Sequence, residues 1–234
     1  MALRAAEAAT QRIHDAQSMI DPTTALTKRF LFVLASARRD GNTEALTRLA
    51  AAGLDTQVEQ EWLHLIDFAL TSFADTRHDD LTGGLYPSPT CDARRLLDAT
   101  LSATDLVIAA PLYWYSLPAS AKLYLDYWSG WMRVPGVDFK ARMAGKTMWA
   151  ISTISDEDRS VADPLIGTLK LTARYMGMRW GGTLLGYGNR PGEILNDTIA
   201  CSTADTFFTA SGERSPGPAE GTEGQGITQV RPGI

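Results

Sequence analysis

A short polar loop after an apolar run carries the side chains with the clearest chemical use. Residues 30–35 read FLFVLA, and residues 36–43 read SARRDGNT. A strand that ends here and turns through Gly41 into a helix leaves unpaired backbone N–H groups at the positive end of the helix dipole. Hydroxyl, amide and guanidinium donors nearby suit a doubly charged phosphate monoester. These side-chain donors are Ser36, Arg38, Arg39, Asn42 and Thr43.

The composition of this loop narrows the kind of phosphate ligand. The dinucleotide-binding fingerprint needs three glycines at fixed spacing, and the nucleoside-triphosphate loop needs Gly-Lys followed by Ser or Thr. Residues 36–43 contain neither pattern. A single terminal phosphate therefore fits better than a pyrophosphate or a triphosphate. The alternative is an ordinary strand-to-helix turn in which Asn42 caps the helix.

A second apolar run leads into an unusual cluster of aromatic residues. Residues 105–110 read DLVIAA, as expected for a strand buried on both faces, and the loop after them contains the adjacent aromatics 113–115. Three neighbouring loop residues cannot all point into one core, so at least one is expected to cover a flat ligand. Ser116 and Pro118 then indicate a helix start, with Ser near the cap and Pro in the first turn.

Together, the loop at 36–43 and the segment at 110–119 resemble the flavodoxin-like NAD(P)H-dependent FMN reductases and quinone reductases. The resemblance spans roughly residues 28–187. It implies an FMN-dependent oxidoreductase that passes hydride from NADPH or NADH through FMN to a small acceptor such as a quinone or a flavin. The residues that it implies for the FMN phosphate are Ser36, Arg38, Asn42 and Thr43. The residues that it implies along the isoalloxazine ring are Pro111, Leu112, Tyr113 and Trp114.

The resemblance also implies a third loop, which meets the pyrimidine edge of the ring. The strand-like run at 146–151 is followed by the sequence Ser152-Thr153-Ile154-Ser155, so Ser152 and Thr153 are the candidates there. The competing interpretation is a capped helix start, with Ser155 as the cap and the acidic residues 156–158 complementing the helix dipole. The cofactor would carry the hydride chemistry, so no side chain is assigned as a catalytic acid or base.

Strand-like runs alternate with helical patterns along the chain, which predicts an α/β fold. We expect a flavodoxin-like, doubly wound, five-stranded parallel sheet of order 2-1-3-4-5 with helices on both faces. In such sheets ligands lie at the carboxyl ends of the strands, between the first and third strands. The predicted strands are 29–35, 57–63, 105–110, 146–152 and 179–185. The predicted helices are 43–53, 91–103, 117–132 and 159–176, with an irregular stretch at 67–90.

Composition excludes several other classes of protein. The 22 basic and 27 acidic residues give a net charge of −5 and are interspersed, so no nucleic-acid partner is indicated. No apolar stretch is long enough to span a bilayer, and the first residues lack a signal-peptide pattern, so we expect a cytoplasmic protein without a membrane partner. The two cysteines, Cys91 and Cys201, have no neighbours at metal-ligand spacing.

The ends of the chain fall outside the predicted FMN-binding domain at 28–210. We expect residues 1–27 to form an N-terminal helical extension. Residues 211–234 form a Gly/Pro-rich tail that we expect to be disordered or to lie on a partner subunit. A predicted helix with Tyr124, Tyr127, Trp128 and Trp131 is rich in aromatics, which favours core packing for some of them and a homodimer or homotetramer interface for the rest.

Two alternatives share the fold but differ in function. One is a flavodoxin-type electron carrier, which would bind FMN without oxidising a pyridine nucleotide. The other is a non-enzymatic module that binds a different phosphate ligand. The sequence leaves open the electron acceptor and the preference between NADPH and NADH.

Overall fold

A computed structural model describes residues 28–209, which form a three-layer α/β arrangement around one parallel sheet. The strand order is β2-β1-β3-β4-β5, with every neighbouring pair parallel, so the predicted 2-1-3-4-5 topology is confirmed. The strands are β1 (Arg29–Leu34), β2 (Glu59–His64), β3 (Asp105–Ala109), β4 (Thr147–Ile154) and β5 (Arg179–Tyr187).

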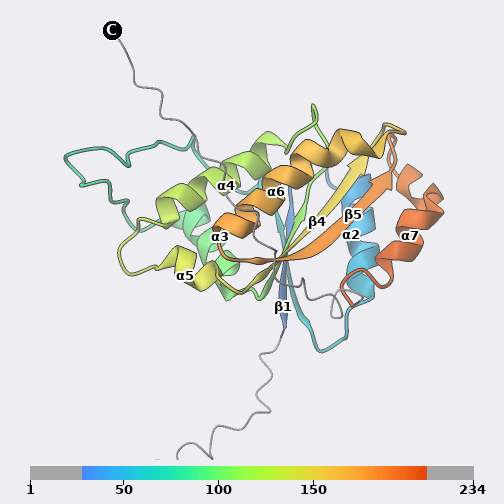
Figure 1. The fold of residues 1–234 in the computed structure, drawn as a ribbon, viewed down its shortest axis with the longest axis horizontal. Helices are drawn as coiled ribbons and strands as arrows, with labels where there is room; N and C mark the ends of the chain where they lie inside the picture. Colours follow the sequence, from blue (N-terminus) through green and yellow to red (C-terminus); the bar gives the residue numbers. More distant parts are fainter. Residues whose placement is uncertain (1–27, 210–234) are drawn as a thin grey trace, which may run out of the picture.

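The helices are divided unequally between the two faces of the sheet (Figure 1). The α-helices are α2 (Asn42–Ala52), α3 (Cys91–Ser102), α4 (Ala119–Trp131), α5 (Phe139–Met143), α6 (Asp163–Tyr175) and α7 (Thr198–Ala204). The short 3₁₀ helices are η1 (Leu65–Asp67), η2 (Arg159–Ala162) and η3 (Glu193–Asn196). Helices α2 and α7 cover one face, and α3 to α6 cover the other.

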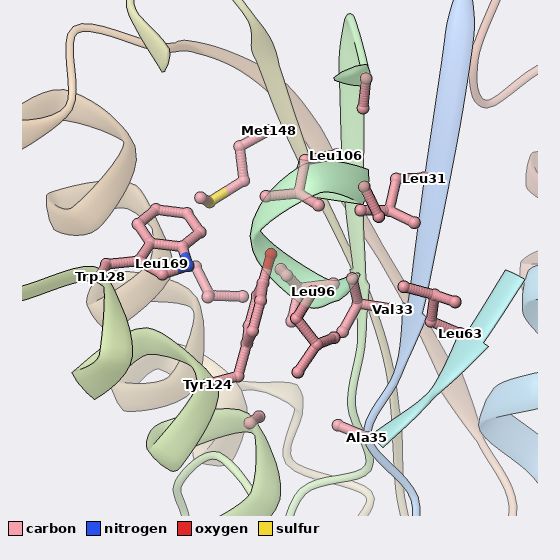
Figure 2. Packing of buried hydrophobic residues seen from close by; sticks show 14 of the residues in the cluster. Leu31, Val33, Ala35, Leu63, Leu96, Leu106, Tyr124, Trp128, Met148 and Leu169 are labelled. Carbon is pink, nitrogen blue, oxygen red and sulfur yellow. The ribbon is translucent and has the colours of Figure 1, made fainter. Parts of the chain in front are cut away.

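The central strands are apolar because both of their faces are covered. All residues of β3 and β4 are buried, and alternate side chains of β1 enter opposite cores. On the α3–α6 side, the Tyr124 ring packs in the core, and its hydroxyl is 2.6 Å from Oγ1 of Thr100 (Figure 2). Tyr124, Trp128 and Trp131 are at most 3% exposed, so core packing is confirmed for these three aromatics.

Several predicted boundaries were wrong, each for a local reason. Strand β4 continues to Ile154 instead of ending at 152, because its last residues pair with β5 through Tyr187. The helix predicted at 159–176 divides into η2, whose first turn is capped by the Asp158 carboxylate, and α6, which has Pro at its start. Helix α4 begins at Ala119, with Pro118 as its N-cap residue rather than in the first turn.

The sequence patterns also missed the short helices α5, η3 and α7. Their lengths are five, four and seven residues, too short for a helical period to be recognised. The N-terminal extension and the predicted C-terminal tail lie outside the described residues.

Gly181 of β5 packs directly on an indole ring. A Cβ atom at this position would overlap the ring of Trp149, whose Nε1–H donates to Asp105 Oδ1 (3.0 Å) in the core. We expect Gly181→Ala to lower the free energy of unfolding by about 1–3 kcal/mol, because the ring cannot move without disturbing its neighbours. Urea denaturation followed by circular dichroism measures the change.

Gly167, inside α6, is the matched control for that substitution. A Cβ atom there would have no neighbour within 4 Å. Gly167→Ala should therefore stabilise the protein by about 0.5–1 kcal/mol through helix propensity alone. Equal effects of the two substitutions would contradict the packing that the structure shows around Trp149.

Candidate functional site

The loops predicted to form the site all start at the same edge of the sheet. Beyond the strand ends, Ala35 N–H donates to the Ala109 carbonyl (2.9 Å), and Ala110 N–H donates to the Ile151 carbonyl (2.9 Å). The N–H of Leu112 then donates to the Thr153 carbonyl (3.2 Å). These bonds hold the loops after β1, β3 and β4 side by side at the switch point of the topology, as expected for a ligand site in this kind of sheet.

The loop after β1 and the start of α2 form a candidate anion cradle, made of residues 36–44. The N-cap residue is Gly41, and the first bond of the helix runs from Ala45 N–H to the Gly41 carbonyl (2.9 Å). The N–H groups of residues 42–44 therefore have no acceptor inside the helix, and the helix dipole adds positive potential there. The Ser36 hydroxyl accepts the Arg38 N–H (3.1 Å), which turns the loop back on itself. The donor set suits a terminal phosphate.

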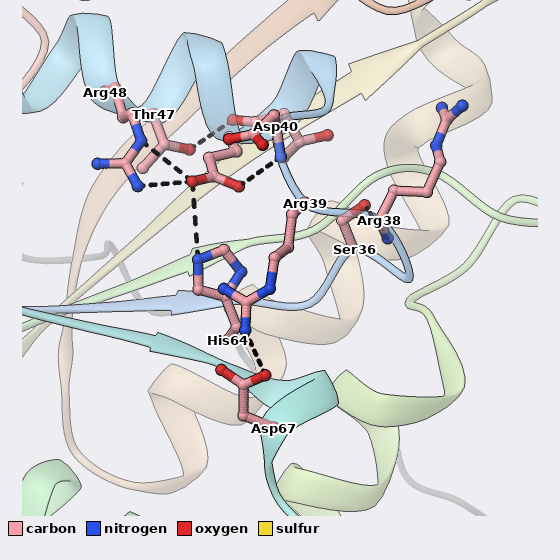
Figure 3. A network of polar contacts seen from close by, with 10 residues as sticks. Ser36, Arg38, Arg39, Asp40, Thr47, Arg48, His64 and Asp67 are labelled. Atoms are coloured by element: carbon pink, nitrogen blue, oxygen red, sulfur yellow. Dashed lines mark hydrogen bonds and ion pairs between the residues drawn. The ribbon is translucent and has the colours of Figure 1, made fainter.

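The two adjacent arginines of this loop differ in whether they form an ion pair (Figure 3). The Arg39 guanidinium forms an ion pair with the Asp67 carboxylate of η1. Arg38 extends away from that pair, and no ion pair within residues 28–209 engages it. Of the two, Arg38 is therefore the cation available to an anionic ligand.

Asn42 and Thr43 direct their side chains to other elements of the fold. Asn42 Nδ2 donates to the Arg190 carbonyl (2.9 Å), and its Oδ1 accepts the N–H groups of Gly192 (2.9 Å) and Ile194 (3.4 Å). The alternative of Asn42 as the helix cap is therefore wrong, since Gly41 occupies that position.

Thr43 links α2 to the end of β4. Its Oγ1 is 2.5 Å from Oγ1 of Thr153, and both side chains are buried. Because both side chains are engaged elsewhere, the donors that Asn42 and Thr43 present at the start of the helix are their backbone N–H groups. The side chains of these residues fix where those N–H groups lie.

The turn that Asn42 holds is a part of the site that sequence reasoning missed. Arg190-Pro191-Gly192-Glu193 closes with a bond from Glu193 N–H to the Arg190 carbonyl (3.1 Å), and Gly192 has φ +86°. Pro followed by Gly at the two central positions favours a type II turn, in which the second central residue has a positive φ. The Pro-Gly pair was visible in the sequence, but nothing local indicated that the turn lies against a loop 150 positions earlier.

Behind the cradle, Glu44 is a buried carboxylate with three partners (Figure 3 shows the contacts around Arg48 and His64). It accepts the Asp40 N–H (3.0 Å), bonds with Arg48 Nη2 (2.6 Å), and lies 3.6 Å from His64 Nε2. Burial alone would raise the pKa of Glu44, but the bonds from Arg48 and the Asp40 N–H, with the nearby His64, lower it overall. Glu44 thus holds Asp40, which has φ 54°, in place.

Folding lowers the pKa of Glu44 from its ordinary value of 4.5. The ionised carboxylate therefore stabilises the folded state at pH values above 4.5. That contribution is lost as the pH falls through the lower pKa of the folded state. We expect Glu44→Gln to cost about 1–3 kcal/mol at pH 7 and to flatten the fall in stability below pH 5. Urea denaturation at pH 3 to 7 tests this. Glu59→Gln, at an exposed ion pair with Arg29, is the control, and identical profiles for both variants would contradict this role.

The aromatic loop after β3 is a tight turn with unusual backbone geometry. Tyr113 and Ser116 exchange two backbone hydrogen bonds (3.2 and 3.0 Å), and the central residues Trp114 and Tyr115 have φ of 50° and 62°. Left-handed geometry costs about 1–2 kcal/mol for each residue with a side chain. Trp114 is 94% exposed and Tyr115 is 58% exposed. Ser116 closes this turn and lies two positions before Pro118, the N-cap residue of α4. Pro111 and Leu112 are half-buried at its base.

The residues predicted from the third loop lie inside β4 instead. Ser152 is fully buried, and its Oγ has no hydrogen-bond partner in the described part of the chain. The loop proper starts at Ser155, and the alternative of Ser155 as a helix cap is wrong because Asp158 caps η2. A cavity of about 200 Å³ separates this loop from the aromatic turn. It is lined by Leu112, Trp114, Tyr115, Ser155, Asp156 and Val161.

Other features do not favour a different site. A cavity of about 520 Å³ lies between residues 69–93 and α4, but none of the predicted site residues lines it. Lys122, at the start of α4, forms an exposed ion pair with Asp126.

Between residues 28 and 209, no three His, Cys, Asp or Glu side chains gather as metal ligands. No helix in the same part of the chain is long and apolar enough to cross a membrane.

Comparisons with known proteins agree with this geometry. The family model described as the flavodoxin-like fold matches residues 28–204. YwqN of Bacillus subtilis (strain 168), provisionally named an NAD(P)H-dependent FMN-containing oxidoreductase, is 33% identical over 175 residues, covering 74% of this chain and 93% of YwqN.

Two solved structures extend the comparison. The Trp repressor binding protein from Bacillus subtilis has a TM-score of 0.61 at 28% identity, over 77% of this chain and 97% of that one. The FMN complex of an FMN-dependent NADH-azoreductase from Bacillus anthracis str. Ames Ancestor has a TM-score of 0.56 at 15% identity, over 78% and 98% of the two chains, and shows the shared fold. Because the family model matches most of its length, this chain belongs to the flavodoxin-like fold family.

Proposed function

We propose that this protein is an FMN-dependent oxidoreductase that takes hydride from NADPH or NADH and reduces a small acceptor such as a quinone or a flavin. The observation that carries the proposal is the meeting of an anion cradle and an exposed aromatic turn at one edge of the sheet. These two features fit the two ends of FMN, a phosphate and a planar ring. The relative YwqN, whose name includes NAD(P)H and FMN, supports the same assignment.

In this proposal the cradle holds the phosphate. Arg38 supplies a guanidinium, and the start of α2 supplies the N–H groups of Asn42 and Thr43. Ser36 shapes the loop through its bond with the Arg38 N–H. The Asn42 and Thr43 side chains fix the helix start against the Arg190–Glu193 turn and β4, so the donors are in place before the ligand arrives.

The ring would lie along residues 111–114, beside the cavity between the aromatic turn and the loop after β4. Thr153 holds the base of this turn through its carbonyl, which accepts the Leu112 N–H. Ser152 lies next to it in the strand, and Ser155 and Asp156 supply polar groups at the far wall. When bound, FMN supplies the hydride chemistry, while the chain positions the ring and covers part of it from water.

Loading and turnover experiments test the proposal. Purified protein, reconstituted with FMN, should retain the flavin through gel filtration and oxidise NADPH or NADH faster when a quinone is added. Retention of FMN without nucleotide oxidation would favour an electron carrier. Failure to retain FMN would favour a module for another phosphate ligand.

The assembly and location of the protein form a separate part of the proposal. We propose that the protein assembles as a homodimer or homotetramer and works in the cytoplasm. Gel filtration with light scattering measures the assembly.

A further inference from the structure

We infer that Arg190 is a second cation for the cofactor phosphate and acts with Arg38 from the other side of the cradle. The inference rests on the proposed function, since it concerns the same site. It adds a phosphate-binding residue from the segment after β5, more than 140 positions after the phosphate loop along the chain. Its consequence is a stronger preference for FMN over riboflavin, which lacks the phosphate.

The backbone of Arg190 is fixed against the first turn of α2. Its carbonyl accepts Asn42 Nδ2–H (2.9 Å), while the Asn42 Oδ1 accepts two N–H groups from the same turn. The approach is close, because a Cβ atom on Gly188 would lie 2.9 Å from Asn42 Nδ2. Only glycine allows the chain after β5 to pass this near. The backbone of Arg190 therefore lies against the side chain of Asn42, the first residue of α2.

The Arg190 guanidinium is available for a ligand. The residue is exposed, and no ion pair within 4 Å involves it anywhere from residue 28 to residue 209. The nearest candidate, Glu193, accepts the N–H groups of Arg190 (2.8 Å) and Asn189 (3.0 Å). These bonds lower the pKa of Glu193, and the charge of Arg190 lowers it further. The carboxylate thus shapes the turn and leaves the guanidinium without a direct partner.

A phosphate monoester carries close to two negative charges at pH 7, and one guanidinium balances only half of that charge. Arg38 and Arg190 are the exposed arginines without ion pairs that flank the start of α2 in the described chain. Each can present two parallel N–H donors to phosphate oxygens. A contact from Arg190 would also connect the ligand to η3 and α7, which follow the turn.

Arg190→Gln tests the inference, with Arg179→Gln as the matched control. Arg179 is also exposed on β5, but it lies at the amino end of the strand, away from the cradle. Apoprotein is titrated with FMN and with riboflavin by flavin fluorescence at several salt concentrations. Arg190→Gln should weaken FMN binding about 10-fold, leave riboflavin binding unchanged and reduce the salt dependence of FMN binding. Arg179→Gln should change none of these.

Arg190→Lys separates the effect of the charge from the effect of the paired guanidinium donors. It keeps the cation but loses the paired donors, so its FMN affinity should fall between wild type and Arg190→Gln. Wild-type FMN affinity in Arg190→Gln would overturn the inference, and so would an equal loss for FMN and riboflavin, which would indicate a structural role. If the wild-type protein itself binds no FMN, the proposed function fails. If the wild type binds FMN and Arg190→Gln binds it with the same affinity, only this inference fails.

Discussion

Replacing Arg38 with Ala will weaken FMN binding by about 10- to 100-fold, whereas replacing Arg39 with Ala will change it by less than about 3-fold. The two residues are adjacent in one exposed loop and carry the same charge. They differ in that Arg39 is paired with Asp67, while Arg38 extends away from that pair (Figure 3). A charge-assisted bond to a phosphate is worth more than the long-range effect of an arginine that is already paired.

Fluorescence titration of apoprotein measures both affinities, and riboflavin is the ligand control. Riboflavin binding should be unchanged in both variants, because neither arginine is expected to meet the ring. Equal losses of FMN affinity for Arg38→Ala and Arg39→Ala would mean that net charge, and not a specific contact, governs binding. A larger loss for Arg39→Ala would contradict the assignment of Arg38.

A variant in which Asn-Gly replaces Trp114-Tyr115 will be more stable and less active than the wild type. Both residues have left-handed backbone geometry, which Asn and Gly adopt at far lower cost. We expect a gain of about 1–3 kcal/mol in the free energy of unfolding of the apoprotein. Loss of two aromatic side chains beside the proposed ring site should lower kcat/KM for a quinone about 10-fold or more.

Urea denaturation and steady-state kinetics test the two halves of this prediction separately. Tyr175→Ala is the control, since Tyr175 is 60% exposed on α6, away from the aromatic turn, and should leave kcat/KM unchanged. A stabilised variant with full activity would remove the aromatic turn from the site. A destabilised variant would contradict the strain that the φ angles indicate.

Strain at this turn explains why sequence alone could not predict its shape. Turns with two left-handed central residues normally contain Asn or Gly there, so Trp-Tyr gave no indication of one. The structure places the aromatics at the tip of a closed turn, with Trp114 almost fully exposed. Backbone strain of this kind is often retained where a ligand uses it.

The sheet was predictable because parallel strands buried on both faces appear as short apolar runs. Residues 105–109 illustrate this, since every one of them is buried. The 36–43 loop was predictable for a related reason, because its glycine and its donors lie next to each other along the chain.

Long-range partners could not be predicted in the same way. The choice between Arg38 and Arg39 depends on Asp67, and the role of the Asn42 side chain depends on the Arg190–Glu193 turn. Glu44 looked like an ordinary helix residue in sequence, and only the fold brings His64 beside it. Local patterns predicted the candidate site, while contacts distant in sequence decide which group of each residue is available to a ligand.

Titration of the wild-type apoprotein with FMN and with riboflavin, under identical conditions, tests the central claim most directly. If the loop after β1 holds the phosphate while the aromatic turn lies along the ring, FMN should bind at micromolar concentrations or below, and riboflavin roughly 100-fold more weakly. Equal affinities for the two flavins, or no binding of either, would contradict the account.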